Sequence, residues 1–132
     1  TKEARERSFG VYQGTNRTKF YSKERSLKEP HKDRPKEGES FVDLYERAKK
    51  FLKRIEAEYS DKTVLVISHG DFTRMCLGVL TGKAPEEARL IKQKNACINI
   101  LDIEDGLKGK LITFNSIDHL PEELKSKNKS EV

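Results

Sequence analysis

The sequence has no long apolar run, few cysteines and no charged-then-apolar leader. None of its apolar stretches approaches the roughly 18 residues that a membrane-spanning helix needs, and no signal-peptide pattern opens it. Its two cysteines, Cys76 and Cys97, both lie in apolar runs, where reduced core thiols are more typical than a disulfide framework. The mean hydropathy is −0.81. We therefore expect a soluble, cytoplasmic protein with no membrane partner.

The sequence also has no zinc-finger spacing, no glycine-rich RNA-binding motif and no internal repeat. Its net charge is +5, with Lys and Arg concentrated between Arg17 and Lys36 and again after Leu124, but Asp and Glu are interleaved with them. A solvated surface explains this pattern better than a nucleic-acid footprint. The three histidines and two cysteines lack the spacing of metal ligands. We expect no nucleic-acid partner, no metal and no cofactor.

A long amphipathic helix is predicted after a polar connection. The connection, residues 22–38, is rich in Lys, Glu and Pro and is expected to be exposed, with room for one helical turn. Ser40 then suits an N-cap, and Asp43 suits the first turn, where a carboxylate complements the helix dipole. Apolar residues follow at alternating steps of four and three, which predicts one buried helix face: Phe41, Tyr45, Ala48, Leu52, Ile55 and Tyr59.

The rest of the chain predicts strands and shorter helices. Residues 63–68 form a β-branched apolar run typical of a strand buried on both faces in a parallel sheet. A second helix is expected from near Asp71 to Gly82, and a short one at residues 85–91. Residues 97–103 and 111–114 predict an antiparallel pair. The fold class is therefore α/β, a three-layer α/β/α arrangement with an incomplete, mostly parallel sheet.

Two segments carry candidate chemistry. His69 and Gly70 follow the predicted buried strand and precede a helix, a junction where open α/β sheets bind ligands and where helix N–H groups favour anions. A structural or capping histidine is an equally good explanation of this pattern alone. Glu6 precedes two glycines, Gly10 and Gly14, and is flanked by arginines. An ordinary surface ion pair is the competing interpretation of Glu6.

Together the segments resemble the histidine phosphatase superfamily, whose members include cofactor-dependent phosphoglycerate mutases. Residues 6–14, Glu-Arg-Ser-Phe-Gly-Val-Tyr-Gln-Gly, resemble the family's E-x-x-x-G-x-x-E/Q-G segment. Residues 38–40 resemble its G-G-E-S/T helix junction, and residues 64–70 resemble its V-L-V-V-S/T-H-G strand. Three motifs in family order make the resemblance specific. It extends from about Ala4 to Leu120, so we expect residues 1–120 to be one domain portion and 121–132 a polar tail.

The resemblance implies the site residues. Glu6 matches the family's general acid and base, and His69 matches the second histidine, which stabilises charge on the phosphoryl oxygens. Gly70 and Arg17 match substrate-binding positions, although a solvated arginine is as good an explanation of Arg17. The family nucleophile, a histidine in Arg-His-Gly, is absent from these residues.

We therefore expect the chain to be the C-terminal portion of a phosphomonoesterase that works through a phosphohistidine, and to be inactive alone. Its expected partners are a phosphorylated small molecule and either the missing N-terminal segment or a second copy of the chain. Hydrolysis is favoured over mutase activity, because the stretch between Gly14 and Gly38 is short. The alternative is a catalytically inactive phosphate-binding or scaffold module of the same fold.

Overall fold

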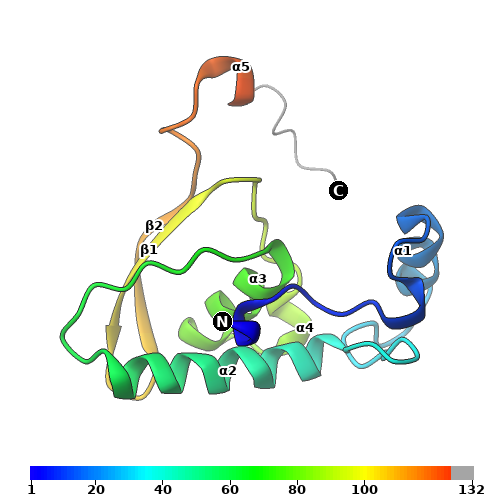
Figure 1. Ribbon diagram of the computed structural model, residues 1–132, viewed down its shortest axis with the longest axis horizontal. Coiled ribbons are helices and arrows are strands. Elements are labelled where there is room, and N and C mark those ends of the chain that lie inside the picture. Colours follow the sequence, from blue (N-terminus) through cyan, green and yellow to red (C-terminus); the bar gives the residue numbers. More distant parts are fainter. Residues whose placement is uncertain (126–132) are drawn as a thin grey trace.

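The longest helix, α2 (Phe41–Glu58), runs along one margin of the molecule, and the other elements are arranged above it (Figure 1). The computed structural model describes residues 1–125. Around α2 lie two 3-10 helices, four further α-helices and two strands: η1 (Lys2–Ala4), η2 (Gly10–Tyr12), α1 (Arg17–Arg25), α3 (Gly70–Leu80), α4 (Pro85–Ala88), β1 (Ile98–Glu104), β2 (Lys108–Ser116) and α5 (Glu122–Lys125).

The start of α2 is fixed by a capping box, in which Ser40 is the predicted N-cap and Asp43 is the predicted carboxylate of the first turn. The Asp43 amide donates to Ser40 Oγ at 3.1 Å, and the Ser40 amide donates to Asp43 Oδ2 at 2.8 Å. These reciprocal bonds satisfy N–H groups that the first helical turn leaves without intrahelical partners. They set the direction in which α2 leaves the loop that precedes it.

The core lies between α2 and α3, with α4 and the hairpin turn completing it. Five α2 residues are buried, at positions that repeat at helical spacing: Phe41, Leu44, Ala48, Phe51 and Leu52. From α3, Phe72 and Met75 are fully buried, and the Phe51 and Phe72 rings pack edge to face at 5.5 Å. Gly78 is required here, because a Cβ on it would lie 2.4 Å from the Ala88 Cβ of α4.

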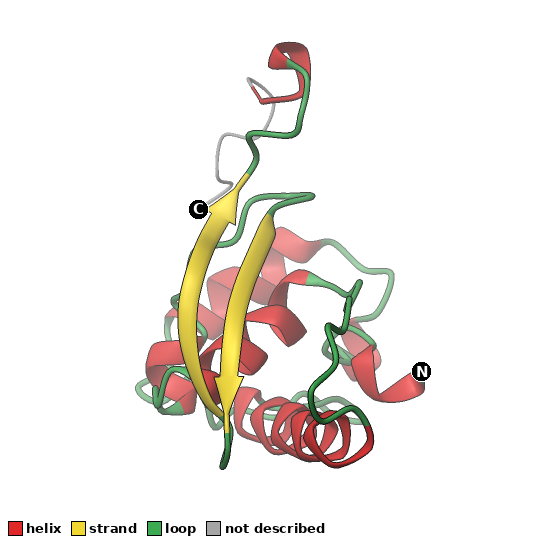
Figure 2. Ribbon diagram, turned by 90° about the vertical axis from the view of Figure 1, so that its left-hand side faces the viewer, coloured by secondary structure: helices red, strands yellow, loops and turns green. Residues whose placement is uncertain are grey.

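The predicted antiparallel pair is confirmed as β1 and β2. Leu101 pairs with Leu111 and Glu104 with Lys108, and the register is irregular nearer the start of β1. The turn between the strands is fastened to α2, because Glu56 Oε1 accepts from the Gly106 amide at 2.9 Å and the Leu107 amide at 3.2 Å. Figure 2 shows this twisted hairpin in front of the helices.

The mixed α/β class is confirmed, but the prediction that residues 63–68 are a buried strand is wrong for the described residues. Among residues 1–125, the one sheet is the antiparallel hairpin, and residues 63–68 are extended without a backbone hydrogen bond to a neighbouring strand. Leu65 is 84% exposed and Ile67 is 85% exposed. A strand is buried on both faces only when neighbouring strands and covering layers exist, and the described residues supply neither.

Residues 22–25 of the predicted connection form the last turn of α1, which agrees with the single helical turn that the sequence allowed there. The helix begins earlier, after Asn16, whose side chain accepts from the Thr18 amide at 2.9 Å. One further prediction needs correction. The third helix ends at Ala88 rather than Ile91. The predicted tail contains the short helix α5, and its residues 126–132 lie outside the described residues. Within residues 1–125, no helix is long and apolar enough to cross a membrane.

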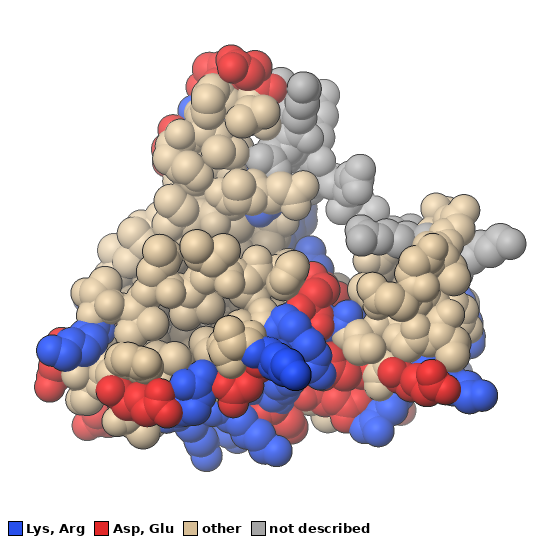
Figure 3. Space-filling model, in the orientation of Figure 1, with Lys and Arg blue, Asp and Glu red and all other residues tan. Residues whose placement is uncertain are grey.

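Charge is distributed unevenly over the face drawn in Figure 3. Lys, Arg, Asp and Glu side chains gather along the margin formed by α2, whereas uncharged residues cover the region of the extended segment and hairpin. Exposed apolar side chains in that region include Leu65, Ile67, Ile100, Ile112 and Phe114. The uncharged face is therefore distinct from the charged margin.

Candidate functional site

The Glu6 carboxylate lies at the N-terminus of α3. Its Oε1 accepts from the Phe72 amide at 3.3 Å and from the Arg7 amide at 3.0 Å. Its Oε2 accepts from the Asp71 amide at 3.4 Å. The Ser68 hydroxyl donates to the Ala4 carbonyl oxygen at 2.6 Å, which fixes the two segments alongside each other. Glu6 and the amides of Asp71 and Phe72, which are 65 and 66 positions away in sequence, thus meet at one helix end, where N–H groups and the helix dipole favour negative charge.

His69 is the N-cap residue of α3 and has an extended backbone, with φ −120° and ψ 166°. Its side chain is exposed and makes no hydrogen bond to another residue of the described chain. Together with Arg5 and Tyr59, it lines a groove of about 600 Å³ beside residues 64–67. An imidazole in this position can donate to an anion that approaches the α3 N-terminus.

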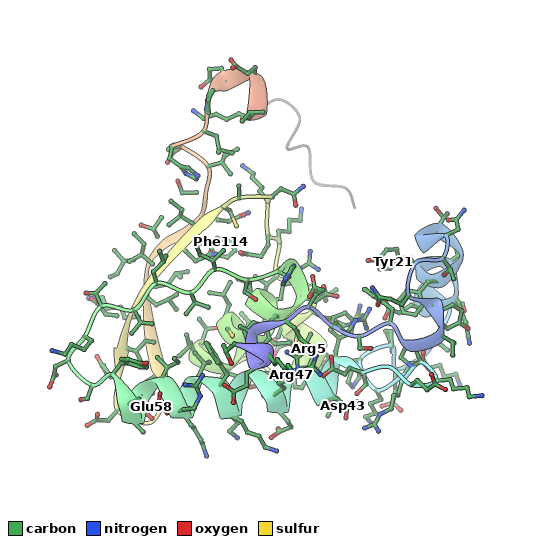
Figure 4. The ribbon with its side chains drawn as sticks, in the orientation of Figure 1. Arg5, Tyr21, Asp43, Arg47, Glu58 and Phe114 are labelled. Atoms are coloured by element: carbon green, nitrogen blue, oxygen red, sulfur yellow. The ribbon has the colours of Figure 1, made fainter. Side chains whose placement is uncertain are left out.

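Arg47 of α2 binds the backbone of the segment that carries Glu6. Its Nη1 donates to the carbonyl oxygens of Glu3 and Arg5 at 2.6 and 2.9 Å, and its Nη2 donates to that of Glu6 at 3.2 Å. The guanidinium also lies 5.3 Å from the centroid of the Phe72 ring in α3. Figure 4 shows Arg47 and Arg5 close together where the N-terminal segment crosses α2. One guanidinium therefore connects α2, the Glu6 segment and α3.

Glu39 holds Arg47 in this position and binds the same segment itself. Its Oε2 accepts from the Ser8 amide at 2.9 Å, and both of its oxygens accept from Arg47 at 2.8 Å. Burial acts to raise the pKa of the Glu39 carboxyl. The hydrogen bonds from Arg47 and the Ser8 amide, with the charges of Arg47 and Arg5, outweigh burial and lower the pKa. Glu39 is therefore an ionised anchor for the segment.

Arg7, next to Glu6, is buried rather than part of a surface ion pair. Its side chain has no exposed area, and Nη1 lies 2.8 Å from Glu24 Oε1, while Nε lies 3.3 Å from Asp71 Oδ2. Its guanidinium carbon lies 3.9 Å from the centroid of the Phe41 ring. Asp71 is also bound by Arg74, at 2.6 Å. Arg7 thus ties the Glu6 segment to α1, α2 and the first turn of α3.

The loop after Glu6 is closed by a contact between backbones at Gly10 and Gly38. Gly10 has φ +55°, and a Cβ there would lie 2.0 Å from the Lys36 carbonyl oxygen. The Val11 amide donates to that oxygen at 3.0 Å, and the Glu39 amide donates to the Ser8 carbonyl at 2.8 Å. This close approach brings Glu39 next to the segment that it anchors.

Comparison with known proteins identifies the family of this arrangement. Residues 1–116 match the sequence model of the histidine phosphatase superfamily (branch 1). The chain belongs to the histidine phosphatase superfamily. It is also similar to phosphoglycerate mutase-like protein 4 of Arabidopsis thaliana, with 28% identity over 90 residues, which are 68% of this chain and 38% of that protein. The chain therefore spans well under half of this relative's length.

The structure brings the predicted acid and base, Glu6, to the N-terminus of α3. It gives less information about the two predicted substrate-binding residues, Gly70 and Arg17. Gly70 is the first residue of α3, and a Cβ on it would meet nothing within 4 Å. Arg17 is the first residue of α1, and its side chain lies outside the described part. No three His, Cys, Asp or Glu side chains within residues 1–125 are grouped in a way that could hold a metal ion.

Sequence reasoning missed the arginines that support the site. Arg47 looks like one of several basic residues on the exposed face of α2, and no local pattern separates it from its neighbours. Arg7 was considered only as a charged neighbour of Glu6, and nothing in the sequence shows that its side chain is buried. Glu39 had a signal, since it lies in the Gly-Glu-Ser junction that carries the family resemblance.

Proposed function

We propose that this chain contributes the general acid and base, Glu6, and the phosphate-contacting histidine, His69, to a phosphomonoesterase that works through a phosphohistidine. The observation that carries the proposal is the hydrogen bonding of the Glu6 carboxylate to the Asp71 and Phe72 amides, directly after His69. A phosphoryl group bound at this helix end would lie within reach of both side chains. The substrate would be a phosphorylated small molecule, and hydrolysis rather than mutase activity is the reaction we favour.

The surroundings of Glu6 and His69 suit proton transfer by the carboxyl group and hydrogen bonding of a phosphoryl group by the imidazole. A carboxyl group beside a leaving oxygen can donate a proton to it and later accept one from attacking water. The exposed imidazole of His69 can donate a hydrogen bond to charge that develops on the phosphoryl oxygens, and the dipole of α3 favours negative charge at this helix end. Gly70 adds no side chain between the helix end and a ligand, and Arg17 is a candidate cation for the rest of the substrate.

The nucleophile would come from a segment with the family's Arg-His-Gly motif, which is absent from these residues. Support comes from residues 63–68, whose backbone groups are unpaired in the described structure and whose Leu65 and Ile67 side chains are exposed. An extended segment of this kind can pair with an added strand. We propose that such a strand delivers the nucleophile beside His69 and extends the fold to the three-layer parallel sheet of the family.

Phosphate titration tests the anion site without requiring turnover. Inorganic phosphate should shift the amide resonances of Gly70, Asp71 and Phe72, and His69→Ala should weaken the binding several-fold. His119→Ala is the matched control, because His119 belongs to the segment between β2 and α5, which lies apart from α3 (Figure 1). Unchanged resonances at the start of α3, or equal weakening by both substitutions, would refute the site.

Turnover tests the catalytic roles. The 132-residue chain alone should not hydrolyse p-nitrophenyl phosphate, and ordinary phosphatase rates would refute an external nucleophile. Adding a polypeptide with Arg-His-Gly from a superfamily relative should restore hydrolysis that depends on both Glu6 and His69. Phosphate binding with no restored turnover would instead favour the alternative, an inactive phosphate-binding scaffold.

A further inference from the structure

The two oxygens of the Glu6 carboxylate are bound by amides whose own side chains contact each other. Oε1 accepts from the Arg7 amide at 3.0 Å, and Oε2 accepts from the Asp71 amide at 3.4 Å. The side chains of these two donors form an ion pair, in which Arg7 Nε lies 3.3 Å from Asp71 Oδ2. The three residues therefore form a closed ring of contacts, and the ion pair sets the spacing of the two amides that hold Glu6.

The Arg7 guanidinium is enclosed by aromatic rings. Its side chain has no exposed area, and its guanidinium carbon lies 3.9 Å from the ring centroid of Phe41, 4.9 Å from that of Phe9 and 5.5 Å from that of Phe20. Within the described residues, its Nε and Nη2 atoms are buried and make no hydrogen bond. A buried cation is costly unless opposite charge balances it, so the position of Arg7 depends on the carboxylates that pair with it.

Glu24 of α1 is the second carboxylate that pairs with Arg7. Its Oε1 accepts from Arg7 Nη1 at 2.8 Å, and its side chain is 12% exposed. In Figure 1, α1 stands at one end of the molecule, apart from α3. Asp71 has a further partner in Arg74 of its own helix, at 2.6 Å. The charge on α1 thus holds Arg7 from one side, while α3 holds its other partner in place.

We propose that Arg7 and Glu24 are positioning residues for the Glu6 carboxylate. Glu24 holds the guanidinium of Arg7 against Asp71, and that contact keeps the two amides at the spacing of the two carboxylate oxygens. The inference rests on the proposed function, in which Glu6 is the acid and base, and it adds two residues that act through Glu6 without touching the substrate. Proton transfer requires the carboxyl oxygen to lie within about 2.6–3.2 Å of the leaving oxygen, so a displaced Glu6 should slow the reaction.

The first test follows the amide protons of Asp71 and Phe72 in the 132-residue chain as the pH is lowered until carboxylates are protonated. Both amides donate to Glu6, so part of their movement with pH should disappear in Glu6→Gln. Glu24→Gln removes a charge at constant side-chain size, and Arg7→Lys keeps the charge but removes the planar fork. Each should reduce the Glu6-dependent movement by about half or more, because hydrogen bonds weaken steeply when they are misaligned.

Glu29→Gln is the matched control for the loss of one charge. Glu29 forms an exposed ion pair with Lys32, in which the side chains are 59% and 60% exposed, and its replacement should leave the Glu6-dependent movement unchanged. The amide spectrum of each variant shows whether the chain is folded. Glu24→Gln decides the test if Arg7→Lys does not fold.

The second test measures turnover after a polypeptide with the Arg-His-Gly motif is added. A misplaced acid and base slows the chemical step more than it weakens substrate binding. Glu24→Gln and Arg7→Lys should therefore lower kcat about tenfold or more while KM changes by less than about twofold. Glu29→Gln should leave both constants unchanged.

The outcomes separate this inference from the proposed function. Movement at Asp71 and Phe72 that is unchanged in Glu24→Gln, or reduced equally in Glu29→Gln, overturns the positioning role while the proposed function stands. Reduced movement with an unchanged kcat refutes Glu6 as the acid and base, while the positioning of its carboxylate stands. Movement that survives Glu6→Gln in full shows that these amides do not bind Glu6, and it overturns both.

Discussion

Arg47 and Glu39 form a two-bond ion pair, in which Nε lies 2.8 Å from Oε1 and Nη2 lies 2.8 Å from Oε2. Both side chains are largely buried, at 13% and 15% exposure. The pair does more than join two charges, because the same arginine binds three backbone carbonyls of the segment that carries Glu6. The position of a candidate catalytic carboxylate thus depends on a residue of α2.

Replacing Arg47 by lysine should destabilise the protein by about 2 kcal/mol, because an ammonium group cannot reproduce the planar set of donors. The free energy of unfolding from urea titration measures the loss. Arg54→Lys is the matched control on the same helix, and its exposed pairs with Glu3 and Glu58 predict a change below about 1 kcal/mol. Equal losses in the two variants would contradict the anchoring role.

The pH dependence of the free energy of unfolding should show the contribution of the ionised Glu39 carboxylate. Because its folded pKa is lowered, Glu39 contributes stability above its unfolded pKa of about 4.3, and that stability is lost as pH falls through the lower folded pKa. Urea titrations at neutral and acid pH should show a smaller loss on acidification for Glu39→Gln than for the parent chain. Parallel pH profiles for the two chains would contradict this assignment.

Gly10→Ala should be much more destabilising than Gly106→Ala. Both glycines have positive φ, at +55° and +76°, so both substitutions strain the backbone. Only at Gly10 does the added Cβ also meet backbone, at 2.0 Å from the Lys36 carbonyl oxygen, whereas nothing lies within 4 Å of it at Gly106. We expect a difference of about 2 kcal/mol or more in thermal or urea unfolding. Similar losses would show that the loop moves aside.

Gly70→Ala should separate stability from ligand binding. The added Cβ has open space, and alanine favours helices over glycine by up to about 1 kcal/mol, so stability should be unchanged or raised. If a phosphate approaches the start of α3 closely, the same methyl group should raise its dissociation constant several-fold. Phosphate titration alongside urea unfolding checks both effects, and an unchanged dissociation constant would argue against close approach there.

The sequence predicted what depends on local pattern. The N-cap of α2 at Ser40, the positions of α2 and α3 and the antiparallel pair of β1 and β2 are all set by residues near one another in the chain. The helix faces were nearly right: Leu44 and Phe51 are buried on α2, although the predicted stripe ran through Tyr45 and Tyr59. A small rotation about the helix axis accounts for this difference.

Features that depend on distant partners were less predictable. Residues 63–68 have the composition of a buried strand, yet their burial requires neighbouring strands. Arg47 acquires its role because the N-terminal segment crosses α2, and Arg7 because Phe41, Glu24 and Asp71 converge on it. The spacing of residues along the sequence does not predict these long-range contacts. Glu6 and His69 were singled out by their positions in the sequence and given roles by the family resemblance, but the groups that contact them could not be identified from the sequence.

The open edge at residues 63–68 has a consequence for the behaviour of the purified polypeptide. Thr-Val-Leu-Val-Ile combines high β-propensity with no charge and no proline, a composition that stacks readily into cross-β assemblies when it is accessible. Concentrated samples should therefore self-associate through this stretch. A lysine at Leu65, whose side chain already faces solvent, would act as a gatekeeper against fibril growth while leaving the α2–α3 core unaltered.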